Sequence, residues 1–175
     1  MKDRIGALFG WSVAIGVRRR ARMNPDAGPR WAAVVVWGVV NAVNVLQTAG
    51  FLSRVRYGMT VNQVLGLVIA ALAVPATAAL VAYLRAGSGA LYWLGPAVFD
   101  AFVVFMLVVE YLHPIEFRSP RMPAILVPYL VLFFGSIVLM GLPMFRIDRS
   151  LWGVTVVTSA LLLASMGYAM FKGVG

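Results

Sequence analysis

The chain is organised as five long apolar stretches separated by short polar connections, and the stretches are residues 31–53, 61–84, 91–113, 123–145 and 151–171. Each is about 21 to 25 residues long, which at about 1.5 Å per residue is enough to cross a hydrocarbon core of about 30 Å. The stretches lack the alternation of a strand and are too long for the strands of a membrane barrel. The pattern therefore predicts an all-α membrane protein with a bundle of about five transmembrane helices.

The connections are short and contain turn-forming residues such as Gly58, Gly87 and Pro120. Short connections make sequential helices antiparallel neighbours. Pro75 lies near the centre of the second stretch, where it removes a backbone donor and is able to kink the helix. A re-entrant hairpin at this point, in place of a full crossing, would change the number of crossings.

Residues 1–30 differ from the rest of the chain because a short apolar stretch, 5–17, is enclosed by basic residues. A secretory signal peptide would end in a small-residue cleavage site, whereas this stretch ends in arginines. It is also too short to span a bilayer, so we expect an amphipathic helix lying in the membrane interface. The competing interpretation is a helix buried against partner subunits. In either case an arginine cluster would contact anionic lipid or a partner: Arg18, Arg19, Arg20 and Arg22.

The composition supports a membrane protein: 62% of the residues are hydrophobic and 12% are charged, about half the charged fraction of a soluble domain. The net charge of +9 does not indicate nucleic-acid binding, because the basic residues are concentrated before residue 31 and at the ends of the apolar stretches. Their distribution predicts a cytoplasmic N-terminus and, after five crossings, a C-terminus outside. We expect a prokaryotic cytoplasmic membrane. The chain has no cysteine, which excludes disulfides and thiolate sites.

Five polar residues inside the apolar stretches form the candidate intramembrane cluster: Asp100, Asn41, Asn44, Gln47 and Thr48. Asp100 lies near the middle of the third stretch, where an acid costs about 2.5 to 3.5 kcal/mol on insertion scales. Asn41, Asn44 and Thr48 share one helix face, and this amide stripe is a natural hydrogen-bond partner for Asp100. We expect Asp100 to be protonated or bonded to amides, because desolvation disfavours its charged form. Interhelical bonding, a translocation path or ligand pocket, and contact with another subunit all remain open for this cluster.

A second polar cluster follows where the third stretch leaves the membrane, and it comprises Glu110, His113, Glu116, Arg118 and Arg121. Glu110 and His113 have the spacing that holds di-iron sites on paired helices, but such a site needs a second pair and further carboxylates. The chain has one histidine. We therefore expect no metal, and a turn facing solvent or lipid headgroups after the helix ends near Pro114.

The sequence contains none of the common catalytic or nucleotide-binding motifs. Its small size, odd number of helices and lack of internal repeats favour a non-catalytic subunit that packs against other membrane proteins, or against copies of itself. One alternative is a small transporter or ion-conducting protein that uses Asp100. A second is a membrane-embedded enzyme acting on lipid. No cofactor is indicated.

Overall fold

The computed structural model describes residues 28–115, 117 and 122–173, and these residues form helices without any strand. The elements are α1 (Arg30–Tyr57), α2 (Met59–Ala71), α3 (Ala73–Arg85), α4 (Ala90–Leu107), the π-helix η2 (Val108–Leu112), α5 (Pro123–Ile147) and α6 (Arg149–Phe171). Five helical segments are long and apolar enough to cross a membrane, with α2 and α3 together forming one and α4 and η2 another. The predicted all-helical architecture and the five span-length segments are confirmed for the described residues.

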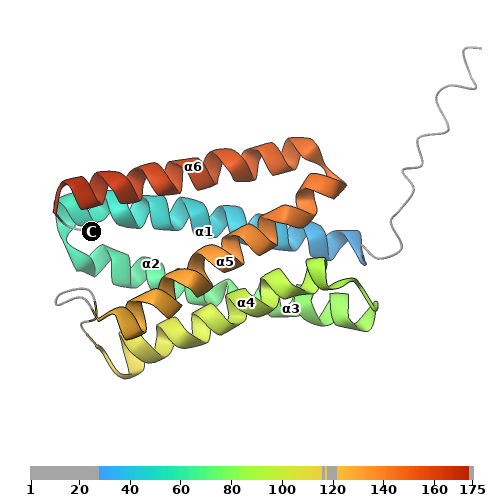
Figure 1. Cartoon of the computed structure of the whole chain (residues 1–175), viewed down its shortest axis with the longest axis horizontal. Coiled ribbons are helices and arrows are strands. Elements are labelled where there is room, and N and C mark those ends of the chain that lie inside the picture. Colours follow the sequence, from blue (N-terminus) through green and yellow to red (C-terminus); the bar gives the residue numbers. More distant parts are fainter. Residues whose placement is uncertain (1–27, 116, 118–121, 174–175) are drawn as a thin grey trace, which may run out of the picture.

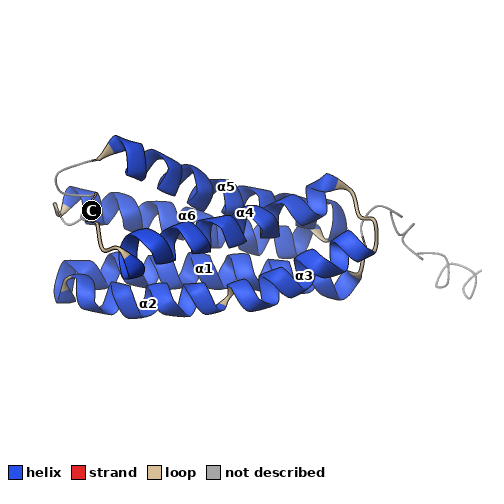
Figure 2. Ribbon diagram, turned by 90° about the horizontal axis from the view of Figure 1, so that it is seen from below, coloured by secondary structure: helices blue, strands red, loops and turns tan. Residues whose placement is uncertain are grey.

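The helices form one elongated bundle (Figures 1 and 2). α1 packs against α6, and α4 packs against both α3 and α5. In Figure 1, α5 crosses the bundle obliquely, while α1 and α6 run side by side along its length. α1 begins at one end of the bundle and α6 finishes at the other, as an odd number of antiparallel segments requires.

The second segment bends but does not reverse. α2 ends at Ala71 and α3 begins at Ala73, with Leu72 between them in a helical backbone conformation. Pro75 explains the break, because it has no N–H to donate to the carbonyl of Ala71 four residues earlier. α3 continues in the direction of α2 (Figure 2). The segment therefore runs the full length of the bundle, and the alternative of a re-entrant hairpin is wrong.

The first helix is longer than the sequence predicted. It continues past Ser53 to Tyr57, and Gly58 alone separates it from α2. Gly58 has a φ of 68°, a conformation that costs little only for glycine, and its N–H donates to the carbonyl of Arg54. The connection expected between residues 53 and 61 is thus reduced to one residue, and Arg54 belongs to a helix.

The buried core has residues from every helix, and several of its aromatic rings lie where α4 meets α5. Phe102 is completely buried, and its ring centroid is 5.3 Å from those of both Tyr129 and Phe133 on α5. These separations are typical of favourable aromatic pairs. Gly95 lets the two helices approach closely, because a Cβ at this position would lie 2.7 Å from the backbone nitrogen of Met140. Asp100 lies on the same helix, five residues after Gly95.

Candidate functional site

The amide stripe of α1 binds hydroxyl groups of α6. Asn41 Nδ2 donates to Thr155 Oγ1 over 3.1 Å, and Thr158 Oγ1 donates to Asn41 Oδ1 over 2.7 Å. Asn44 Nδ2 donates to Thr158 Oγ1 and to Ser159 Oγ, each over 3.0 Å. Both asparagines therefore face the same neighbouring helix, as their spacing predicts. These hydrogen bonds join the first and last helices over about one turn of each helix.

The predicted bonds between these amides and Asp100 are not formed, because α6 rather than α4 lies against the stripe. Thr48 donates to the backbone carbonyl of Asn44, four residues earlier, and so remains within α1. Gln47 lies apart from the stripe and lines a cavity toward α5. The five residues predicted to form one intramembrane cluster thus lie in three separate parts of the bundle. Their side chains do not form a single cluster.

Asp100 contacts α3 instead. Its Oδ2 accepts a hydrogen bond from Thr77 Oγ1 over 2.9 Å, while its Oδ1 is buried and accepts none within the described residues. Asp100 is half-buried and Thr77 is exposed, so the pair lies on the outer face of α3 and α4. Asp100 is the eleventh residue of the 23-residue segment Ala90–Leu112, close to its midpoint. The sequence identified the depth of this acid but not the face of the bundle on which it lies.

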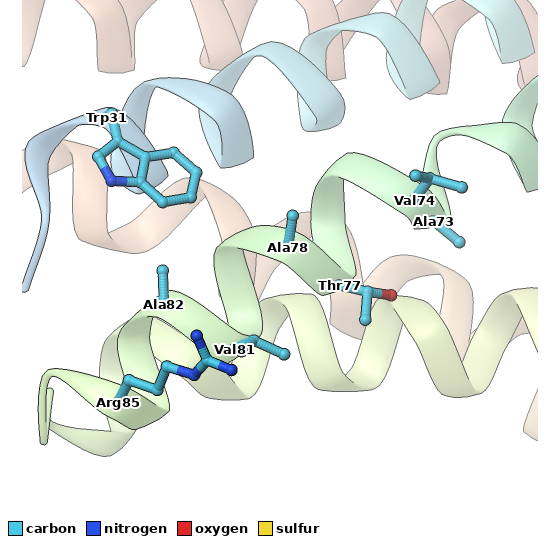
Figure 3. A pocket seen from close by; sticks show the side chains of 8 residues that line it. All are labelled: Trp31, Ala73, Val74, Thr77, Ala78, Val81, Ala82 and Arg85. Carbon is cyan, nitrogen blue, oxygen red and sulfur yellow. The ribbon is translucent and has the colours of Figure 1, made fainter.

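Beside this pair is an open groove of about 720 Å³ between α1 and α3. Figure 3 shows Trp31 of α1 on one side and side chains of α3 on the other, with Ala78 and Ala82 pointing toward Trp31. Thr77 belongs both to the groove and to the bond with Asp100, and Arg85 closes the groove near the bundle end. Small side chains along α3 leave room for a backbone to approach closely. Trp31 and Thr77 were not predicted, because their proximity comes from helix packing.

The predicted exit cluster is described only in part. Glu110 lies in the π-helix η2, which ends where His113 N donates to the Val108 carbonyl over 2.8 Å. Pro114 explains this end, since it cannot continue the ladder of backbone bonds. His113 is exposed, as expected for a turn at a membrane exit. The remaining members lie outside the described residues, as does the N-terminal arginine cluster: Glu116, Arg118, Arg121, Arg18, Arg19, Arg20 and Arg22.

The π-helix places Tyr111 against α2. Its hydroxyl donates to the backbone carbonyl of Gln63 over 2.6 Å, and it lies over Gly66, where a Cβ would collide with the hydroxyl oxygen. A π-helix adds one residue to the turn, which rotates the following side chains relative to a regular helix. The Glu-x-x-His spacing therefore does not place Glu110 and His113 on adjacent turns of an α-helix.

Arg54 was expected in a connection but is buried in the last turns of α1, with 8% of its surface exposed. Its guanidinium carbon lies 5.0 Å from the centroid of the Phe51 ring, a cation–π distance. Residues three apart on a helix lie on the same face, so Phe51 and Arg54 are neighbours. This proximity was not predicted, because the first helix was expected to end at Ser53.

Within the residues that the structure describes, no group of three or more histidine, aspartate and glutamate side chains is placed to hold a metal ion. Comparison of the chain with protein-family models, with curated proteins and with solved structures found no match.

Proposed function

We propose that this protein is an integral membrane protein that acts as a non-catalytic subunit of a larger assembly. Its outer α3–α4 face would bind a transmembrane helix of another polypeptide. The observation that carries this proposal is the position of the Asp100–Thr77 pair, half-exposed and close to the middle of a span-length helix.

The physical argument concerns what covers Asp100 in a bilayer. Acyl chains supply no hydrogen bonds, and ionisable residues in membrane helices normally face a bundle interior or a water-filled cavity. Thr77 supplies one bond to Asp100, and the pair remains on the outside of the bundle. A neighbouring helix with a polar side chain at this depth would complete the coordination of the carboxyl group and shield it from lipid.

The groove beside the Asp100–Thr77 pair also favours the α3–α4 face as the binding site for the partner helix. Its α3 side includes Ala73, Ala78 and Ala82, which permit close approach of a second helix. Trp31 would then contact that helix from α1, because it lines the opposite side (Figure 3). A partner that fills the groove would bury Trp31, 54% of which is exposed in the isolated chain.

Residues 1–30 would add an interfacial contact. We place this basic segment on the cytoplasmic surface, where Arg18, Arg19, Arg20 and Arg22 meet anionic lipid headgroups or the partner. Arg30, Arg85, Arg146 and Arg149 belong to the same end of the bundle, because α1 and α6 begin there and α3 and α5 end there. The basic residues therefore support a cytoplasmic location of that end.

A homo-oligomeric transporter is the second candidate, and the outward position of Asp100 favours it specifically. Copies that meet through the α3–α4 face would bring several Asp100 side chains around a shared path. The two candidates use the same face but differ in what binds to it, and one experiment separates them.

The experiment uses the absence of cysteine in the chain. Ala78→Cys places a thiol in the groove without touching the Asp100–Thr77 bond, and Val156→Cys places one on the exposed side of α6. Both positions are seven residues from a basic helix end, so they have matched depths. The two variants are treated with a thiol cross-linker in native membranes and then purified in mild detergent for mass measurement.

We expect Ala78→Cys to form a cross-link to a different polypeptide, and Val156→Cys to form none. A cross-link between two copies of this chain would favour the transporter and contradict the subunit proposal. Equal cross-linking at both positions, or recovery of an uncross-linked single chain, would contradict both candidates.

A further inference from the structure

A cavity of about 320 Å³ lies between α1, α5 and α6, toward the end of the bundle where α1 and α6 finish. Eight of its ten lining residues are apolar or aromatic, and the other two are Gln47 and Arg54. Small-molecule sites are typically apolar cavities of about 300 to 1,000 Å³ with a few polar groups that fix orientation. The α1–α5–α6 cavity has this composition.

Its two polar residues lie at different depths. Gln47 and Arg54 are seven residues apart on α1, so they share a face and are separated by about 10 Å along the axis. Arg54 is in the last turns of the helix, at the level where headgroups begin if the helix crosses a bilayer. Gln47 is two turns deeper. The cavity thus has a cationic end near the bundle surface and an inner end with a neutral amide.

The walls between these ends fit a hydrocarbon chain. Phe133 and Tyr129 line the α5 side, and Met166 lines the α6 side. Methionine side chains are flexible and adapt to an irregular ligand surface. At the other end, Arg54 is only 8% exposed and its guanidinium lies by the Phe51 ring, which limits where the cation can move. A guanidinium recognises carboxylate and phosphate groups with paired hydrogen bonds.

We propose that the α1–α5–α6 cavity binds one acyl chain of an amphiphile with an anionic headgroup. The carboxylate or phosphate would contact Arg54, and the chain would extend toward Gln47 between the aromatic and methionine side chains. Two sources carry this chemistry, a free fatty acid and an anionic phospholipid of the bilayer. The site is separate from the α3–α4 face, so it does not depend on the proposed function.

The test is a titration of the purified full chain in non-ionic detergent with cis-parinaric acid, a fatty acid whose fluorescence rises in an apolar site. The matched variants are Arg54→Gln and Arg56→Gln. These arginines are two residues apart, but Arg54 lines the cavity while Arg56 is exposed. We expect saturable binding of one probe per chain, weakened about tenfold in Arg54→Gln, as for a lost charge-assisted hydrogen bond. Arg56→Gln should change the Kd by less than about twofold, because exposed charges contribute little.

A neutral competitor separates the role of charge from that of the cavity. Hexadecanol should displace the probe equally well from the wild type and from Arg54→Gln. Leu130→Trp places a larger side chain at the wall of the cavity, and the position is 37% exposed, so the substitution does not overpack the fully buried core. It should abolish binding of both the acid and the alcohol, while circular dichroism verifies its helical content. This variant tests the site even if Arg54→Gln does not fold.

Displacement by palmitate alone would assign the site to free fatty acids, and displacement by phosphatidylglycerol would assign it to bilayer phospholipid. The proposal is overturned if wild-type binding does not saturate, if neither competitor displaces the probe, or if Arg54→Gln and Arg56→Gln have equal effects. It is also overturned if a folded Leu130→Trp variant binds the probe as the wild type does.

Discussion

Gly95 of α4 lies against the backbone of Met140 of α5, so closely that a Cβ on Gly95 would be 2.7 Å from the Met140 nitrogen. Gly95→Ala should therefore destabilise the protein by about 1 to 3 kcal/mol, because the two helices must separate to admit the methyl group. The measurement is the thermal-unfolding midpoint in detergent.

Gly38 provides the control for this prediction. It is also within a helix, but a Cβ there would meet no atom within 4 Å. Gly38→Ala should be neutral or slightly stabilising, because alanine has the higher helix propensity. Equal midpoints for the two variants would show that the α4–α5 contact is looser than described.

The second prediction concerns the bond between Asn44 and Ser159, which joins α1 to α6 over 3.0 Å. A double-mutant cycle with Asn44→Ala and Ser159→Ala should give a coupling of about 0.6 kcal/mol, the average for interhelical hydrogen bonds in a membrane protein. Ser165→Ala serves as the control partner, because Ser165 donates to the Leu162 carbonyl of its own helix. Coupling of the same size with Ser165 would contradict a direct Asn44–Ser159 bond.

The third prediction concerns Asp100. Asp100→Asn keeps the size of the side chain and an oxygen that accepts the bond from Thr77, so the variant should unfold at nearly the wild-type temperature. Asp100→Arg places a long cation near the middle of a span-length helix and should lower the midpoint strongly. Thermal unfolding of both variants in detergent provides the comparison. A loss of stability in Asp100→Asn as large as in Asp100→Arg would show that the ionised carboxylate is required.

The fourth prediction concerns orientation. A reporter that is active only in the cytoplasm, fused after Gly175, should be inactive, because five span-length segments lie between the start of α1 and the end of α6 in the described part of the chain. The same reporter placed in the turn after Arg85 should be active, since that turn and the start of α1 lie at the same end of the bundle. The reverse pair of results would contradict the orientation, and two equal results would contradict the number of crossings.

The positions of the helices were predictable because length and apolar content determine them. The segments 123–145 and 151–171 differ from α5 and α6 by two residues at one end. The error at the end of α1 has a physical reason. Arg54 and Arg56 look like connection residues, yet one is packed over Phe51 and the other over Tyr57 within the helix.

The partners of the polar residues were not predictable, because helical spacing shows which side chains share a face but not which helix they meet. Asn41 and Asn44 do share a face, and that face meets the hydroxyls of α6. Asp100 is on the third segment, yet Thr77 of the second segment binds it. Choosing between these neighbours requires the order of helices around the bundle, which one sequence does not contain.

The contact between the first and last helices has a consequence for the synthesis of the chain. Asn41 and its partner Thr155 are 114 residues apart. At about 5 to 20 residues per second, the ribosome takes roughly 6 to 23 s to make the intervening chain. Throughout that interval the amides of α1 are complete but their hydroxyl partners do not yet exist. Until the final helix arrives, the described partner of Asn41 is the Trp37 carbonyl of its own helix, so water or the insertion machinery must supply the remaining hydrogen bonds.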